Sequence, residues 1–325
     1  MSNLNNRILV TGATGFLGSS LGKTLSLAGR FSVKAHVRTD IKLPWAEEVI
    51  QLSDFSKIQV SDNIFEKVDA VIHCAARVHV MNDATSNPLE EFRKVNVDGT
   101  LHLARLAAKA GVRRFIFISS IKVNGENTES GKIYKADDTP APKDPYGISK
   151  MEAENGLKQI AAETGMELVI IRPVLVYGPG VKANFLAMMR WVHKGVPLPL
   201  GAIQNKRSLV ALDNLIDLIV TCIEHPAAAN QIFIASDGED LSTSELLRRM
   251  ANALGVRTRL LPVPQSLLVI MATILGKKPV AQRLCGSLQV DISKAQELLG
   301  WTPPLSVDEG LRLVASSYLT AVTKR

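Results

Sequence analysis

The sequence predicts an α/β fold, a doubly wound parallel sheet with a smaller, mostly helical C-terminal lobe. In the first half, short apolar runs alternate with longer segments of helical pattern, which is typical of βαβ units and a parallel sheet. A glycine-rich turn directly follows the first apolar run and opens a helix. With 325 residues, 46% of them hydrophobic, the chain is long enough for one large domain or two smaller ones.

The expected strands are short apolar runs, at residues 7–10, 32–37, 68–74, 114–119, 167–171 and 231–235. The expected helices between them span residues 15–29, 88–110 and 145–164. After Pro173 the alternation becomes irregular, and the last expected helices span residues 243–254, 266–275, 293–299 and 306–320. We therefore expect a Rossmann-like domain over 1–177 and 208–236, and a smaller lobe over 178–207 and 237–325. Ligand should lie between them, at the carboxyl ends of the strands.

The net charge of the chain indicates which classes of molecule it is expected to bind. Lys and Arg total 38 and Asp and Glu total 31, a net charge of +7. This modest excess suits anionic small molecules such as phosphorylated cofactors. No dense Lys/Arg block of the kind found in nucleic-acid-binding segments is present in the sequence, so we expect no nucleic-acid partner.

The cysteines and the apolar segments indicate where in the cell the protein is expected. Cys74, Cys222 and Cys285 are far apart, so the spacing suggests neither a disulfide framework nor a zinc site, and we expect no metal. A reducing cytoplasm is the expected location, and the polar N-terminus does not resemble a signal peptide. The apolar run 266–275 is too short for a bilayer span, which needs about 20 residues. We expect a buried or interface helix there, with membrane-surface contact as the alternative.

The glycine-rich turn predicts a dinucleotide site. Gly12 permits the tight turn, Gly15 lets backbone N–H groups approach a pyrophosphate, and Gly18 lets the helix pack closely on the strand. The N-terminus of the following helix supplies a partial positive charge and free N–H donors. The remaining residues expected to line the cofactor at this turn are Thr14, Phe16 and Leu17.

The end of the second strand bears on the choice of cofactor. An acidic residue there would accept hydrogen bonds from an adenosine ribose diol, but the strand ends at Arg38 with no Asp or Glu before Asp40. Arg38 instead suits a 2′-phosphate, so NADP is slightly favoured over NAD. Asp54 is either a cap for the adenine amino group or an ordinary turn residue.

Tyr146 and Lys150 predict acid–base chemistry. They are four residues apart, so on a helix they share one face. A nearby ammonium and an oxidised nicotinamide would lower the phenol's pKa, which allows Tyr146 to exchange a proton with a sugar hydroxyl while hydride moves. Ser119 and Ser120 end a strand at the ligand-binding edge, where one hydroxyl can share that proton.

Taken together, these motifs resemble the extended short-chain dehydrogenase/reductase family, in its nucleotide-sugar epimerase/dehydratase branch. The resemblance covers nearly the whole chain and rests on residues 11–18 (TGATGFLG), 73–76 (HCAA), 96–100 (NVDGT), 119–120 (SS), 146–150 (YGISK), 172–173 (RP) and 176–180 (VYGPG). It implies a catalytic set of Ser120, Tyr146 and Lys150, with Lys150 also holding the cofactor. The remaining implied cofactor positions are Ala75 and Ala76 along the cofactor, Asn96 as a support for the strand end, and Pro173 at the start of a loop over the nicotinamide.

The resemblance also implies a UDP-sugar substrate. Asn184 and Arg207 match positions that bind the nucleotide diphosphate, and Arg283 resembles a second clamp. Asn124 stands where the family often has a tyrosine near the sugar. The helices 88–110 and 145–164 match the family's dimer contact, so we expect a homodimer.

Two activities are the leading expectations, ahead of a hydroxysteroid- or flavonoid-type reductase and of a cofactor-binding regulatory protein without catalysis. The first is reduction of the C4 keto group of a UDP-linked N-acetyl, 6-deoxy sugar, since the sequence is similar to bacterial surface-polysaccharide enzymes of the UDP-N-acetylquinovosamine dehydrogenase type. Arg38 in place of an acid favours this activity, because a net reductase draws NADPH from a pool. The alternative is a UDP-hexose 4-epimerase with the same catalytic residues.

Overall fold

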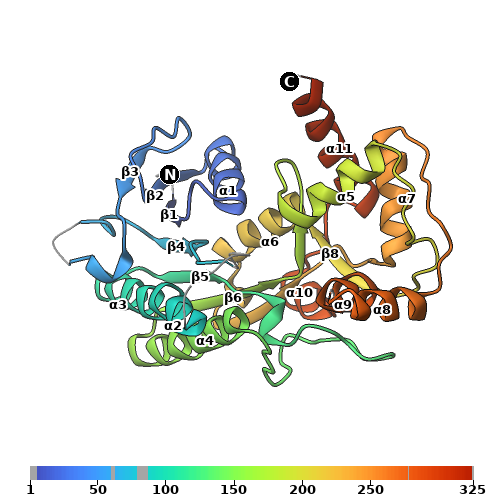
Figure 1. Cartoon of the computed structure of the whole chain (residues 1–325). Helices are drawn as coiled ribbons and strands as arrows, with labels where there is room; N and C mark the ends of the chain where they lie inside the picture. The colour runs from blue at the N-terminus through green and yellow to red at the C-terminus, as the bar shows by residue number, and fades with distance from the viewer. Residues whose placement is uncertain (1–5, 60–62, 79–86, 277, 324–325) are drawn as a thin grey trace.

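A large parallel sheet with helices on both faces dominates the computed structural model, which describes residues 6–59, 63–78, 87–276 and 278–323 (Figure 1). Its strands are β1 (Asn6–Thr11), β2 (Phe31–Val37), β3 (Glu48–Gln51), β4 (Ala70–His73), β5 (Arg114–Ile118), β6 (Glu167–Pro173) and β9 (Gln231–Ala235). Their order is β3-β2-β1-β4-β5-β6-β9, and all pairs are parallel. The strand order reverses between β1 and β4, and a crevice at such a switch point is where ligands bind.

Alternation of side chains gives the sheet two cores. Ile8 and Val10 of β1 point into a core with α1 (Phe16–Leu27) and α6 (Leu212–Glu224). Leu9, between them, joins the opposite core with α3 (Thr100–Lys109) and α4 (Pro145–Thr164). Because a parallel sheet is covered on both faces, its strands are apolar on both sides, which explains the near-continuous apolar runs in the sequence.

One long helix contains a local irregularity. α2 (Pro88–Arg93) continues through a π-helical segment, Lys94–Gly99, into α3. Such π-turns insert an extra residue per turn and often occur at functional sites. This one contains Asn96, whose side chain reaches the strand edge described below.

A second, three-stranded sheet begins directly after β6. It consists of β7 (Leu175–Tyr177), β8 (Arg207–Ala211) and β10 (Asp240–Leu241) in the order β10-β8-β7. The expected loop at Pro173 is wrong: Pro173 ends β6, where it is paired with Ala235, and only Val174 separates it from β7. The chain therefore passes from β6 of the large sheet into β7 of the second sheet with only one residue between the two strands.

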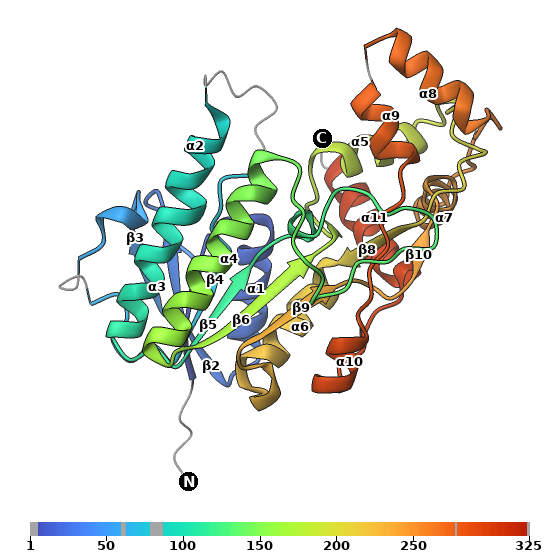
Figure 2. The same ribbon diagram turned by 90° about the horizontal axis from the view of Figure 1, so that it is seen from below.

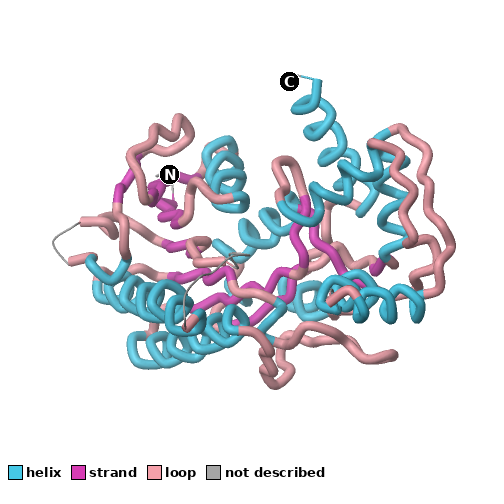
Figure 3. Tube along the Cα trace, in the orientation of Figure 1, coloured by secondary structure: helices cyan, strands magenta, loops and turns pink. Residues whose placement is uncertain are grey.

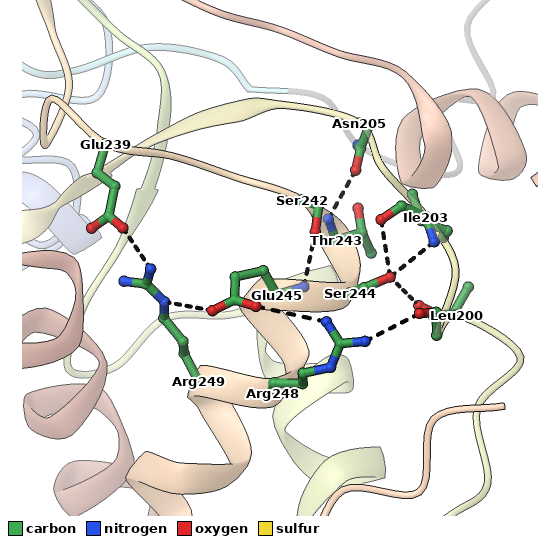
Figure 4. A network of polar contacts seen from close by, with 11 residues as sticks. Leu200, Ile203, Asn205, Glu239, Ser242, Thr243, Ser244, Glu245, Arg248 and Arg249 are labelled. Atoms are coloured by element: carbon green, nitrogen blue, oxygen red, sulfur yellow. Dashed lines mark hydrogen bonds and ion pairs between the residues drawn. The ribbon is translucent and has the colours of Figure 1, made fainter. Parts of the chain in front are cut away.

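The C-terminal lobe, seen in Figures 2 and 3, contains the helices α5 (Ala183–His193), α7 (Thr243–Leu254), α8 (Gln265–Ile274), α9 (Lys278–Cys285) and α11 (Val307–Thr323). The remaining helix, α10 (Ser293–Leu299), packs instead on the core of the large sheet, to which its Ala295 and Leu299 belong. Tyr177, Phe185 and Leu247 belong to the core of this lobe. A hydrogen-bonded network around Ser244 at the start of α7 ties the helix to the chain at Leu200 and Ile203 (Figure 4).

The predicted fold class is confirmed, and differences concern short or exposed elements. Seven elements were not expected from the sequence, namely β3, β7, β8, β10, α5, α6 and α9. The apolar run expected as a buried or interface helix is α8, and none of its residues is buried. Across the described residues, no helix combines the length and apolar character needed to cross a bilayer.

Candidate active site

The glycine turn between β1 and α1 has the shape that a pyrophosphate requires. Gly12 has a φ of 67°, and a Cβ there would lie 2.8 Å from the backbone nitrogen of Ala75. A Cβ at Gly18 would overlap the carbonyl group of Gly12, so α1 packs on the turn only because Gly18 has no side chain. Thr14 and Gly15 are exposed. No side chain caps α1 at Gly15, and its first turn contains no acidic residue, so its N–H donors suit an anion.

The other residues expected to line the cofactor near this turn are half-buried in the protein. Phe16 and Leu17 are half-buried and pack against the core beneath α1. Ala75 and Ala76 are half-buried just beyond β4. The residues of the turn and of the β4 edge therefore fit a dinucleotide, whose phosphates the backbone N–H groups at the start of α1 would contact.

A set of buried hydrogen bonds shapes the end of β4. The His73 ring bonds Thr11 at 2.8 Å and Thr100 at 3.0 Å, and burial holds its pKa well below the usual value. Asn96 accepts the Arg77 N–H at 2.8 Å and donates to Ser149 at 3.0 Å. In this structure Asn96 thus supports the segment after β4 and joins it to α4, as the resemblance implied.

Arg38 and Asp54 lie beyond the end of β2. Arg38 is exposed directly after the strand, where an adenosine ribose would be read. Asp54 accepts the Ser56 N–H at 2.9 Å and caps the short helical turn Phe55–Lys57. That hydrogen bond lowers the pKa of Asp54, and it gives the residue the turn role that the sequence left as one alternative.

The start of α4 places Tyr146 at the edge of the sheet. Asp144 accepts the Gly147 N–H at 2.6 Å, and Pro145 occupies the first helical position. This N-cap and proline fix where the helix begins. Tyr146 and Lys150 are consequently one turn apart on the same face.

Ser120, Tyr146 and Lys150 come together where β5 ends. The Ser120 hydroxyl lies close enough to the Tyr146 phenol to lower its pKa against the effect of burial. The Lys150 ammonium is buried, donates to the Ile118 carbonyl at 2.8 Å and lies 4.4 Å from the ring centroid of Phe117. The three side chains expected to be catalytic therefore converge at the carboxyl edge of the strands. This place is next to β4, the strand that separates β5 from β1 and its glycine turn.

Burial shifts the pKa values of both Tyr146 and Lys150. Burial raises the pKa of Tyr146 to about 12; the Asp144 carboxylate adds to this, and the nearby Ser120 hydroxyl opposes it. Lys150 is not among the causes of this shift, and the expected lowering of the phenol's pKa by Lys150 together with an oxidised nicotinamide stays a prediction. Burial lowers the pKa of Lys150 itself to about 8, against the raising effect of the Glu154 carboxylate.

A buried ionic network that the sequence analysis missed lies beneath this set. Arg172 donates to both Glu154 oxygens, at 2.9 and 2.5 Å, and both side chains are 1% exposed. The Ser119 hydroxyl donates to Glu154 at 2.5 Å. Ser119, expected at the cofactor, thus belongs to this network. Helical spacing was an available signal, because Glu154 lies four residues after Lys150 on the same helix.

Asn124 is part of the same network. Its side-chain oxygen accepts from Arg172 at 3.0 Å, and its side-chain nitrogen donates to the Lys135 carbonyl at 2.9 Å. The residue is 2% exposed. The substitution of asparagine for the family's frequent tyrosine is therefore explained by a buried hydrogen-bonding role.

The expected diphosphate residues are only partly brought together. Arg207, at the start of β8, donates to the Arg283 carbonyl at 3.2 Å and to the Gly286 carbonyl at 3.0 Å. Burial lowers the pKa of Arg207. Arg283 lies exposed on α9, beside Arg207. Asn184 lies exposed in the first turn of α5 and takes no part in the bonds that join Arg207 to α9.

Known sequences are similar to this chain over most of its length. The profile of the NAD dependent epimerase/dehydratase family matches residues 8–235. A UDP-glucose 4-epimerase of Vibrio cholerae is 50% identical over 315 residues, which cover 97% of this chain and 96% of that one. The match includes both the sheet domain and the C-terminal lobe.

Solved structures share the fold. A UDP-glucose 4-epimerase of Thermotoga maritima with UDP-glucose has a TM-score of 0.76 at 23% identity, covering 97% of this chain and 99% of that one. A UDP-glucuronic acid 4-epimerase of Bacillus cereus in complex with NAD has a TM-score of 0.78 at 21% identity, covering 98% of both chains. With the profile match over most of its length and a relative of 50% identity, the chain belongs to the NAD dependent epimerase/dehydratase family and is an enzyme of the extended short-chain dehydrogenase/reductase type.

Proposed function

We propose that this enzyme is a UDP-hexose 4-epimerase that uses NAD. From the sequence alone, a C4 keto reductase is the leading expectation and the epimerase is the alternative. The relative from Vibrio cholerae, half identical over nearly its whole length, supports the epimerase instead. The complex of the Bacillus cereus structure with NAD likewise gives no support to the expected preference for NADP.

The observation that carries the proposal is the meeting of three side chains. The Ser120 hydroxyl at the end of β5 lies near the Tyr146 phenol and favours its ionised form, and Lys150 lies one turn along α4 with its ammonium bonded to the Ile118 carbonyl. A hydroxyl, a phenol and a buried ammonium at this edge are the groups needed to move a proton at a sugar oxygen.

When bound, NAD would accept the hydride from C4 of the sugar and return it to the opposite face. Tyr146 takes the proton of the C4 hydroxyl and later gives it back, while Ser120 orients the C4 oxygen. With a pKa near 12, Tyr146 holds its proton at neutral pH, which suits the return step. The forward step needs a lower pKa, and a cation beside the phenol has that effect.

The diphosphate of the substrate fits the edge of the second sheet. Arg207 is fixed at the start of β8 by carbonyl groups of the segment at the end of α9. Its guanidinium has further donors for phosphate oxygens. Arg283 on α9 supplies a second positive charge near it.

A reductase of a UDP-linked 4-keto, N-acetyl, 6-deoxy sugar is the second candidate. Arg38 favours it, because an exposed guanidinium follows β2 at the position of an adenosine ribose. Such an enzyme would draw NADPH from a pool, whereas an epimerase keeps one NAD and returns the same hydride.

Purified protein without added cofactor distinguishes the two activities. With UDP-glucose or UDP-N-acetylglucosamine, we expect the C4 epimer to accumulate with no net consumption of a nicotinamide, as followed by anion-exchange chromatography. Tyr146→Phe should lower kcat by about 10²–10⁴-fold. Tyr318→Phe, in the C-terminal helix, should leave kcat unchanged. NADPH oxidation only with a 4-keto sugar, and no epimer, would overturn the epimerase and support the reductase.

A further inference from the structure

We propose that α8 docks this enzyme on the surface of a membrane that contains anionic lipids. The proposal rests on the exposed face of α8 and the charge around it, and it stands apart from the identity of the sugar. α8 lies at the outer end of the C-terminal lobe, away from the seven-stranded sheet (Figures 1 and 2).

α8 exposes an apolar stripe to solvent. Leu267, Ile270, Met271 and Ile274 follow the spacing i, i+3, i+4 and i+7, which places them on one face. Their exposed fractions are 46%, 55%, 50% and 79%. The helix has 10 residues and none of them is charged, and all four residues of the stripe are apolar. A stripe of this kind marks a contact surface rather than scattered surface residues.

The opposite side of α8 holds the helix on the protein. Leu268 and Val269 are half-buried and pack against the core of the C-terminal lobe. Pro264 precedes the helix, and Gly276, with a φ of 66°, follows it. One face of α8 therefore packs on the lobe, and the apolar stripe on its other face points to solvent.

The charge around α8 points to an anionic surface. Residues 250–290 contain five Lys or Arg residues and no Asp or Glu. Arg257 and Arg259, on the connection into α8, are exposed, and within the described part of the chain neither is in an ion pair. A basic segment of chain around an apolar helix face is a combination that binds anionic lipid surfaces.

The length of α8 determines how it would lie. A helix of 10 residues is about 15 Å long, short of the roughly 30 Å needed to cross a bilayer. It would lie in the plane of the interface with the stripe toward the acyl chains. A second copy of this chain fits less well, because a two-fold contact through α8 would bring the same uncompensated positive charges together.

Flotation of the full-length protein with vesicles tests the proposal. Wild type should bind vesicles of phosphatidylglycerol and phosphatidylethanolamine and should remain free with phosphatidylcholine alone. Ile270→Ser/Ile274→Ser should weaken the partition coefficient about tenfold or more, because two apolar side chains no longer enter the interface. Arg257→Ser/Arg259→Ser should weaken binding to anionic vesicles, and salt should weaken the wild type in the same way.

Matched controls separate docking from misfolding and self-association. Leu27→Ser/Leu313→Ser removes two exposed leucines elsewhere, 87% and 43% exposed, and should bind like the wild type. The Ile270/Ile274 variant should unfold at the wild-type temperature. The proposal fails if the wild type ignores anionic vesicles, or if the Ile270/Ile274 variant binds them equally well. It also fails if sedimentation shows a dimer that this variant abolishes and vesicles do not bind, since a second copy would then cover the stripe.

Discussion

Two ionic networks of similar chemistry lie in very different surroundings. Beneath the candidate catalytic set, Arg172 and Glu154 pair with both side chains 1% exposed. In the C-terminal lobe, Arg249 bridges Glu239 and Glu245, with exposed fractions of 24%, 44% and 40% (Figure 4). Water can solvate the second set if one partner is lost, but it cannot reach the first. The same kind of contact should therefore matter much more below the active site than in the lobe.

The largest effect is expected from Glu154→Gln. This change keeps the side-chain shape and removes the only carboxylate paired with Arg172 among the described residues, leaving a buried guanidinium uncompensated. We expect the free energy of unfolding to fall by about 3–5 kcal/mol in urea titrations. Glu152→Gln, two residues away in an exposed pair with Arg93, is the matched control and should cost about 1 kcal/mol or less. Equal losses would contradict the role assigned to burial.

The next effect is a pH dependence that arises at Lys150. Its pKa is lowered to about 8 in the folded protein, from 10.5 in the unfolded reference. Between these values the unfolded chain binds the extra proton, so stability should rise with pH. The shift corresponds to at most about 3 kcal/mol. Above about pH 10 the raised pKa of Tyr146 acts the other way, because the unfolded tyrosine loses its proton first.

Lys150→Met tests that rise. The gain in stability between pH 8 and pH 10, measured by urea unfolding, should shrink in this variant. Lys158→Met, on the exposed side of the same helix, should follow the wild-type profile. A Lys150→Met profile that rises as steeply as the wild type would show that another group is responsible.

These comparisons explain which features the sequence could predict. The strands of the large sheet were found because buried parallel strands are apolar on both faces. Tyr146 and Lys150 were placed together because helical spacing is a local property. The four-residue strand β3 and the two- to five-residue strands of the second sheet have too little periodic pattern to be recognised.

Other features depend on what surrounds a residue. Arg172 and Glu154 lie on different elements, so their pairing follows from packing of α4 against the sheet. The direction of the Tyr146 pKa shift required knowing how deeply the ring is buried and where the Lys150 ammonium is bonded. The apolar run at 266–275 reads the same whether it is buried or exposed, so only the structure shows the stripe on α8.

A smaller effect is expected at Ser244, a buried neutral group of the lobe. Its hydroxyl donates to the Leu200 carbonyl at 2.5 Å and accepts the Ile203 N–H at 3.0 Å. Ser244→Ala leaves both partners unsatisfied and should cost about 1–3 kcal/mol in urea unfolding. Ser316→Ala, on the exposed side of α11, should change stability by less than about 0.5 kcal/mol. A Ser244 loss as small as that of Ser316 would mean that water replaces the missing hydroxyl.

The smallest effect is expected at Arg249. Its carboxylate partners Glu239, Glu245 and Asp308 raise its pKa, yet all four side chains remain accessible to water. Arg249→Ala should lower the free energy of unfolding by about 1 kcal/mol or less, and added salt should shrink the difference. The measurement is a urea titration at low and high ionic strength. If this loss matched that of Glu154→Gln, burial would not determine how much an ion pair of this protein contributes to stability.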